Sequence, residues 1–284
     1  MIQLIIDGIV YGSIFALLGF AISAVFMTTG VVNFAIGESI TFSMYVTYLT
    51  IVYFSIPYPV IILEVLLLTM VITYLISRFI IQPLLPYGHL IATIGTASMF
   101  IILPILTINL DTQSRKFPNP SMDFLKNSFV SSWDLTIIIV SAIIAMGLYL
   151  FVMRSNWGIG IRAIKSNQDS AISIGLPVNK IFFITVGISG LVAGIVGLLA
   201  APKLLLAPNF MFPPFIAAIA GAVLGGLRNP MGVYVGCLLM GIFQSLAGGY
   251  FGNIAHEVIP ILLILLVLIL KPEGLFSKKS ETRV

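Results

Sequence analysis

The chain has 284 residues, of which 59% are hydrophobic and only 8% are charged, and its formal net charge at pH 7 is +4. A soluble domain carries about 25% charged residues, so this composition cannot cover a water-facing surface. The sequence therefore predicts an all-α, polytopic membrane protein. Because the basic residues lie in loops and in the tail, the positive charge does not indicate a nucleic-acid partner.

Apolar runs predict about eight to nine spans in a single transmembrane domain over residues 1–284, since a bilayer core of about 30 Å needs about 20 apolar residues per helix. The first run has no basic residues before it, so we expect it to be retained rather than cleaved as a signal peptide. The seventh run is short and is expected to be broken or re-entrant. The predicted spans are Leu4–Met27, Asn33–Phe54, Tyr58–Ile81, His89–Leu110, Leu135–Met153, Ile181–Ala201, Phe212–Leu227, Met231–Tyr250 and His256–Leu270.

The second span opens with polar residues in the stretch VVNFAIGESI, which contains Asn33, Gly37 and Glu38. Polar groups at membrane depth are costly and are therefore candidates for function. A break between Gly30 and Asn33 would free backbone groups that need partners inside the membrane. We expect Asn33 and Glu38 to fasten this bend rather than to bind cargo.

Further polar residues lie in the fourth and eighth spans. Thr93, Thr96 and Ser98 occur in LIATIGTASMF, and Gln244 follows much later in the chain. These four residues are candidates for a translocation path. The alternative for the hydroxyl side chains is that they bond the backbone of their own helix.

The central loop, residues 154–180, is the most polar internal stretch and includes Arg162 and Lys165. Reversing the chain direction takes about four residues, and this loop uses 27. We interpret it as a docking element for a cytoplasmic partner. The alternative is a solvated basic loop that only fixes the topology.

The central loop carries the signals of a short helix. Asn167 can cap its start, Asp169 falls in the first turn, and Gly175 can adopt the left-handed conformation that closes it. The predicted apolar face of this helix consists of Ala171, Ile172 and Ile174.

Small residues in the sixth span predict close helix packing. Gly190 and Gly194 lie four residues apart, and Gly197 lies on an adjoining line of the same helix. Such spacing lets two helix backbones approach each other within a bilayer.

The distribution of lysine and arginine predicts the orientation. If the central loop is cytoplasmic, nine spans place the N-terminus outside and the basic tail, residues 271–284, in the cytoplasm of a cell-membrane protein. Lys203 is then the one basic residue on the wrong side.

Several kinds of catalytic machinery have no counterpart in the sequence. It contains no G-x-x-x-x-G-K-[ST] motif for ATP and no Ser/His/Asp constellation. Two distant histidines and one cysteine make no metal site. We therefore expect a transport subunit rather than an enzyme, with no cofactor of its own.

Ordered blocks along nearly the whole chain resemble the permeases of branched-chain amino-acid ABC transporters, the LivH/LivM-like family. The blocks include GIVYGSIFALLGFAISAVFMTTGVVNFAIGE, LIATIGTASMF, GIGIRAIKSNQDSAISIGLPVNKI and LLILLVLILKPEGLF. Two departures are Ile36, where the family usually has His or Gln, and Arg228 to Pro230, which replace a small polar pair. These departures leave open the alternative of a related permease for urea, short amides or simple sugars.

The resemblance implies an importer built from two permease subunits, identical or sister chains, with two cytoplasmic ATPases that hold ATP and Mg²⁺ and an extracellular solute-binding protein. It also implies that the helix in the central loop is a coupling helix between the fifth and sixth spans that docks on the ATPase. A self-contained channel or secondary carrier is the competing class, and it would need intramembrane carboxylates that are few here. The coupling residues are predicted to be Arg162, Lys165, Asn167, Asp169, Ala171, Ile172 and Gly175.

Overall fold

The structure is a computed structural model that describes residues 1–111, 113–118, 131–271 and 274–276, apart from the side chains of Asp169 and Asn253. Within these ranges the chain is helical, and the β-like contact is an isolated antiparallel bridge between Arg115 and Leu206. The helices are α1 (Ile2–Thr29), α2 (Ala35–Phe54), α3 (Tyr58–Ile76), α4 (Gln82–Leu84), α5 (His89–Ala97), α6 (Met99–Leu110), α7 (Ser132–Arg154), α8 (Asn156–Ser166), α9 (Gln168–Ser173), α10 (Val178–Ala200), α11 (Phe212–Gly225), α12 (Pro230–Phe251) and α13 (Asn253–Leu270).

The long apolar helices confirm the predicted class. In the described residues, seven helical segments are long and apolar enough to cross a membrane, and two shorter apolar helices are Phe212–Gly225 and Ile254–Leu270. Two predicted spans contain local irregularities: α3 continues through a π-helical turn, Ser77–Ile81, and the fourth span is divided into α5 and α6. The protein is thus a polytopic helical bundle, and the nine apolar segments coincide with the nine predicted spans.

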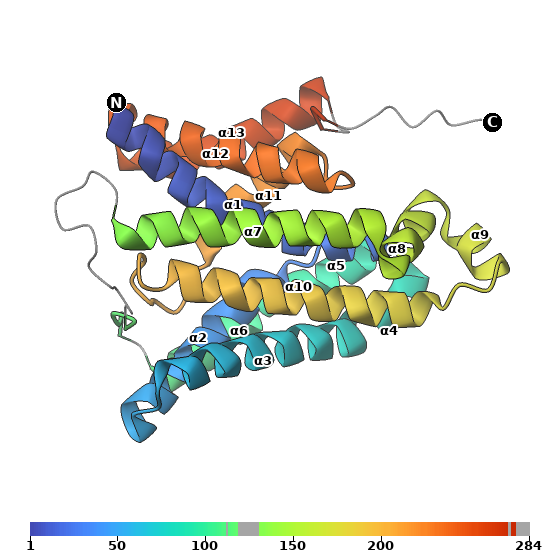
Figure 1. Ribbon diagram of the computed structural model, residues 1–284, viewed down its shortest axis with the longest axis horizontal. Coiled ribbons are helices and arrows are strands. Elements are labelled where there is room, and N and C mark those ends of the chain that lie inside the picture. Colours follow the sequence, from blue (N-terminus) through green and yellow to red (C-terminus); the bar gives the residue numbers. More distant parts are fainter. Residues whose placement is uncertain (112, 119–130, 272–273, 277–284) are drawn as a thin grey trace.

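The first helix lies at the centre of the bundle. In α1, 83% of the most apolar 18-residue window is buried, because α7, α10, α11 and α12 all pack against it (Figure 1). Two serine hydroxyls from other helices bind its backbone: Ser189 donates to the Ala21 carbonyl at 2.8 Å, and Ser245 donates to the Leu4 carbonyl at 2.7 Å. These bonds hold α10 and α12 to the central helix.

The sixth predicted span, α10, crosses α3 and α2 at its glycines. A Cβ atom added at Gly190 would lie 2.7 Å from the Met70 Cα, and one at Gly194 would lie 3.1 Å from the Leu66 Cα. A Cβ atom at Gly197 would lie 2.8 Å from an Ile40 methyl group on α2. The missing side chains therefore allow α10 to approach both neighbours closely.

The seventh segment has a helix that is too short to cross a bilayer. At 1.5 Å per residue, the 14 residues of α11 extend about 21 Å, less than the hydrocarbon thickness of about 30 Å. The turn before it, residues 201–211, contains the buried side chains of Leu206, Phe210 and Met211. Non-helical chain thus enters the bundle here and lies against protein, as backbone at membrane depth must.

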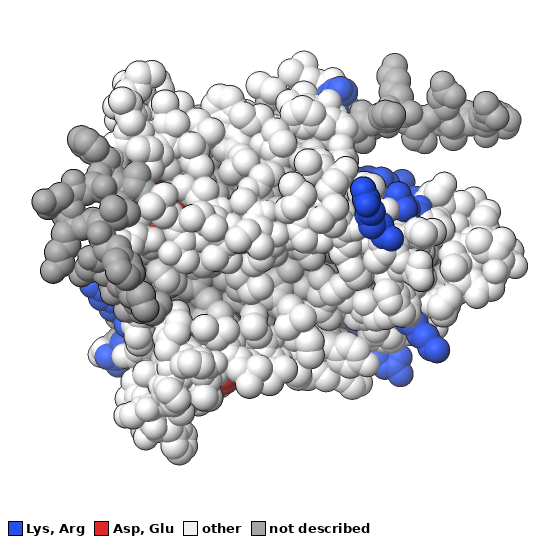
Figure 2. Space-filling view, in the orientation of Figure 1, with Lys and Arg blue, Asp and Glu red and all other residues white. Residues whose placement is uncertain are grey.

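The charged residues lie toward the two ends of the long axis (Figure 2). The N-terminus lies at one end, and α8 and α9 lie at the other (Figure 1). At the N-terminal end, Lys203 forms an ion pair with Asp134 and lies 5.3 Å from the centre of the Tyr11 ring. Lys203 thus lies at the end away from α8 and α9, as the sequence predicted, and its charge is paired there with a carboxylate.

Candidate functional site

The central loop folds into two helices that project from one end of the bundle (Figure 1). The first, α8, was missed by the sequence interpretation. Its start is capped by Ser155, whose hydroxyl accepts a hydrogen bond from the Gly158 N–H at 2.9 Å. Serine at this position is a usual N-cap signal and could have revealed the helix.

The second helix, α9, has the predicted caps. The Asn167 side-chain oxygen accepts from the Ser170 N–H at 2.9 Å, and Gly175 has φ of 80°. The Gly175 N–H donates to the Ile172 carbonyl at 2.9 Å, which closes the last turn. Asp169 lies in the first turn of α9, and its side chain is outside the described residues.

The predicted apolar face of α9 needs a correction at Ala171. This side chain is only 2% exposed and packs in a cluster with Met27, Ile161, Ile164 and Ile181. A helix this short is unstable alone and must bury one face on its own chain. Ala171 therefore faces the ends of α1 and α10, so it is not free to enter a partner. The exposed apolar residues are Ile172, at 54%, and Ile174, at 75%.

The two basic residues of α8 have different surroundings. Arg162 is exposed, and its guanidinium donates to the Met153 carbonyl at 3.2 Å, at the end of α7. Lys165 is half-buried, and burial away from water lowers the pKa of its ammonium group, as does the nearby charge of Arg228. Arg162 thus ties α8 to α7, whereas Lys165 faces another cation.

The break between α1 and α2 is held by Asn33 and Thr96. The buried Asn33 side-chain oxygen accepts from the Ala35 N–H at 3.1 Å, and the Thr96 hydroxyl accepts from the Phe34 N–H at 3.2 Å. The Thr96 oxygen also lies 3.2 Å from the Val32 carbonyl oxygen. Thr96, predicted for a translocation path, therefore bonds backbone that the break would otherwise leave unpaired.

Glu38 differs from the expectation that it fastens the bend. Its side chain is 1% exposed, yet its Oε2 has no hydrogen-bond partner among the described residues. Gly37 faces the Phe215 ring, where an added Cβ would lie 3.2 Å from the nearest ring atom. At this bend the side-chain hydrogen bonds come from Thr29, Asn33 and Thr96, and Glu38 is a buried carboxyl group on α2.

The other residues predicted for a translocation path contact different elements. Thr93 donates to the His89 carbonyl, and Ser98 donates to the Gly95 carbonyl, both within their own segment. Gln244 is buried, and its amide donates to the His256 carbonyl of α13 at 3.0 Å. Thr96 also donates to the Thr93 carbonyl of its own helix at 2.8 Å. The alternative of helix-backbone bonding thus describes all three hydroxyl side chains, whereas Gln244 links two helices.

The structure contains further buried polar atoms that the sequence patterns did not indicate. Among the described residues, the hydroxyl oxygens of Thr47, Thr73 and Ser77 are buried without a hydrogen-bond partner, as is the amide nitrogen of Asn33. Ser77 begins the π-helical turn that follows α3. Such turns are frequent at functional sites, and no simple sequence signal reveals them.

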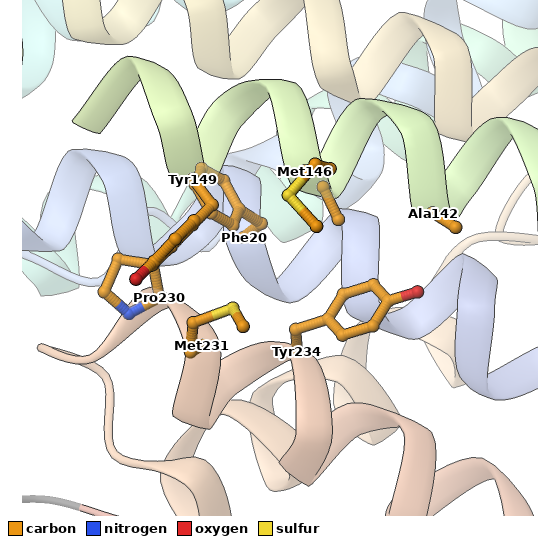
Figure 3. Close-up of a pocket in the computed structure, with 8 residues that line it drawn as sticks. Phe20, Ala142, Met146, Tyr149, Pro230, Met231 and Tyr234 are labelled. Carbon is orange, nitrogen blue, oxygen red and sulfur yellow. The ribbon is translucent and has the colours of Figure 1, made fainter. Parts of the chain in front are cut away.

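An apolar cavity of about 160 Å³ lies between α1, α7 and α12. Figure 3 shows Met146 and Tyr149 of α7 on one side, Met231 and Tyr234 of α12 on the other, and Phe20 of α1 between them. None of its lining side chains is charged. The cavity therefore has no group that could neutralise a charged cargo.

Long apolar spans, a buried break at the second span and a folded two-helix projection define a polytopic membrane protein of the kind that forms transport subunits. In the described residues, no three His, Cys, Asp or Glu side chains are grouped so that they could hold a metal ion. The family model described as branched-chain amino acid transport system / permease component matches residues 4–268, and the chain belongs to this family.

Several relatives match almost the whole chain. The BraD permease protein of the high-affinity branched-chain amino acid transport system of Pseudomonas aeruginosa is 25% identical, over 100% of this chain and 98% of its own. A probable branched-chain amino acid transport permease protein, LivH, of Methanocaldococcus jannaschii is 26% identical, over 96% of this chain and 92% of its own. LivH of Escherichia coli K12, from a high-affinity branched-chain amino acid transport system, is 24% identical, over 100% of this chain and 97% of its own.

A solved structure supports the fold. PsaBC from Streptococcus pneumoniae, in complex with Fab, aligns with a TM-score of 0.52 at 10% identity and covers 94% of this chain and 91% of its own. At this identity the similarity concerns the arrangement of helices.

Proposed function

We propose that the chain is the membrane-spanning subunit of an ABC importer that translocates branched-chain amino acids. The substrate is inferred from the relatives, which are named for branched-chain amino acid transport and match over almost their full lengths. In this proposal, two cytoplasmic ATPase subunits bind ATP and Mg²⁺, an extracellular solute-binding protein delivers cargo, and a second permease subunit, identical or a sister chain, completes the path.

The exposed pair Ile172 and Ile174 is the observation that carries the coupling role. Ile172 lies on α9, which projects beyond the bundle, and Ile174 follows directly as its C-cap residue; each is more than half exposed. Exposed apolar residues on a helix outside the membrane indicate a surface that another protein covers. We assign them to contact with an ATPase subunit, in place of Ala171.

The packing of α9 explains how it would transmit motion. Ala171 joins α9 to α1, α8 and α10 through the cluster with Met27, Ile161 and Ile181, and Arg162 joins α8 to the end of α7. A displacement of α9 by the ATPase would therefore reach three long helices as a rigid-body movement. Because ATP hydrolysis takes place in the partner subunits, the permease needs no catalytic groups of its own.

In this proposal the orientation in the membrane follows from the contact between α9 and an ATPase. An ATPase contacts α9 only in the cytoplasm, so the end with α8 and α9 is cytoplasmic and the N-terminus lies outside. The end of α13 is then cytoplasmic too, because Phe276 accepts a hydrogen bond from Asn229, whose neighbour Arg228 lines the same cavity as Lys165 of α8. In this proposal the chain is a multi-pass protein of the cell membrane.

The coupling role is tested with the double variant Ile172→Asp/Ile174→Asp. We expect the ATPase subunits no longer to co-purify with the permease, because two carboxylates cannot be buried in an apolar pocket without partners. Asn179→Asp is the matched control, since it adds a negative charge at an exposed site of the same loop outside α9.

Gel filtration of each purified variant verifies that the permease is folded. Wild-type recovery of the ATPase with the double variant, together with wild-type uptake, would refute the docking role of α9. The substrate is tested separately, by ATP-dependent uptake of leucine, isoleucine, valine, urea and sugars into vesicles that contain the whole importer.

A further inference from the structure

A polar cavity of about 280 Å³ lies at the α8–α9 end of the molecule. Its walls come from four places: the last turn of α1, the first residue of α5, the junction of α8 and α9, and the turn between α11 and α12. Pockets for drug-sized ligands have volumes of about 300–1,000 Å³, so this cavity suits a smaller molecule.

One wall of the cavity is cationic. Lys165 of α8 and Arg228 of the α11–α12 turn both line it, and their charges repel each other. The ion pairs found in the described part of the chain, Arg115 with Asp111 and Lys203 with Asp134, lie elsewhere and involve neither residue. Among the described side chains that line the cavity there is no carboxylate. Two adjacent cations of this kind favour an anionic ligand between them.

The C-terminal turn of α1 also lines the cavity, with Thr28, Thr29 and Gly30. A helix C-terminus carries a partial negative charge that favours cations such as an ammonium group. Phe26, Met27 and Ile164 add apolar surface to the lining. The remaining lining residues are polar: His89, Ser166, Asn167 and Gln168.

We propose that this cavity binds a zwitterionic aliphatic amino acid from the cytoplasm. Its carboxylate faces Lys165 and Arg228, its ammonium group faces the end of α1, and its side chain lies against Met27 and Ile164. The inference rests on the proposed function, because a branched-chain amino acid is the product that an importer releases on this side.

Binding at this site has a regulatory consequence. An amino acid in the cavity touches α1, the α8–α9 junction and the α11–α12 turn at once, and so holds the two coupling helices against the bundle. A ligand that binds one arrangement of α8 and α9 more tightly opposes movement to the other. Cytoplasmic product should therefore slow the transport cycle when it accumulates.

The first test measures ATP hydrolysis by the whole importer in vesicles, with the solute-binding protein and leucine inside and the ATPase side facing outward. Leucine added outside should inhibit hydrolysis saturably. Arg228→Gln should raise the half-inhibitory concentration by about tenfold or more, as expected for loss of a hydrogen bond to a charged group. Lys180→Gln is the control, because it removes an exposed positive charge of the central loop that does not line the cavity. Each inhibition curve is normalised to the uninhibited rate of that variant.

Two analogues test the zwitterion. 4-Methylpentanoate lacks the ammonium group and 3-methylbutylamine lacks the carboxylate, so each should inhibit at least about tenfold more weakly than leucine. Equal inhibition by 4-methylpentanoate or by inorganic phosphate would overturn the proposal in favour of a general anion site. Equal half-inhibitory concentrations for the wild type and Arg228→Gln would also overturn it.

The second test does not depend on transport. A cysteine at Ser166, which lines the cavity, should be protected from a maleimide by leucine, whereas one at Asn179 should not. The buried native thiol, Cys237, should not react in the folded protein. Lack of protection at Ser166 refutes the cavity proposal. Lack of leucine uptake by the wild-type importer refutes the proposed substrate instead, so the two failures are distinguishable.

Discussion

The close crossing of α10 and α3 makes a quantitative prediction about Gly190. A methyl group at this position would lie 2.7 Å from the Met70 Cα, whereas ordinary van der Waals contact begins at 3.4 Å. The nearest atom belongs to the backbone, so no side-chain rotation can relieve the clash, and the two helices must separate by several tenths of an ångström. Overpacking of this kind costs about 1–3 kcal/mol.

Gly187→Ala provides the matched control on the same helix. A Cβ atom at Gly187 meets no atom within 4 Å, so this variant changes only the intrinsic preference of the residue for a helix. Because Gly190→Ala has the same effect on that preference, the difference between the two variants isolates the clash. We expect Gly190→Ala to be less stable than Gly187→Ala by about 1–3 kcal/mol.

The measurement is reversible unfolding of the purified permease in mixed micelles by titration with sodium dodecyl sulfate, followed by circular dichroism. Transport by the assembled importer should fall with the stability of Gly190→Ala and should stay at the wild-type level in Gly187→Ala. Free energies of unfolding that agree within about 0.5 kcal/mol would refute the close crossing of α10 and α3.

Thr96→Val should lower the free energy of unfolding by about 1 kcal/mol, because the Phe34 N–H loses its acceptor. Thr96→Ser keeps the hydroxyl and should restore the stability, and the melting temperatures of the two variants test this difference. Lys203→Met should destabilise more than the double variant Lys203→Met/Asp134→Asn, because the single change leaves a carboxylate of low exposure unpaired. Additive effects in that double-mutant cycle, measured by unfolding, would contradict the ion pair. Gly175→Val should lower stability by about 1–2 kcal/mol and reduce the amount of ATPase that co-purifies, because φ is 80° at this residue. Gly175→Asn should have a smaller effect, since Asn tolerates this backbone conformation better. Equal recovery of the ATPase with the two variants would argue against strain at this position.

The apolar spans were predictable because their signal is local. Runs of apolar residues end at Gly, Pro or polar residues, and the predicted second span, Asn33–Phe54, differs from α2 by only two residues at its start. The caps of α9 were equally local, since Asn167 and Gly175 act on backbone groups a few residues away.

The remaining features depend on contacts between distant parts of the chain. Lys203 pairs with Asp134, 69 residues away in the sequence, and the Thr96 hydroxyl accepts from the Phe34 N–H, 62 residues away. The apolar period of α9 could not show which of its faces is covered by the same chain and which remains exposed. For this reason the sequence located the projecting element but assigned Ala171 to the wrong surface.

The central position of α1 has a consequence for biosynthesis. This helix is synthesised before the other described helices, whereas α12, on which it packs most extensively, follows near the end of that order. A Cβ atom at Gly241 of α12 would lie 2.3 Å from the Gly12 nitrogen of α1, so the two backbones meet with no side chain between them. Until α12 is inserted, the glycine face of α1 has only lipid or a chaperone to cover it. Assembly of the bundle must therefore finish after translation of α12, and chains truncated before it should be substrates for membrane quality control.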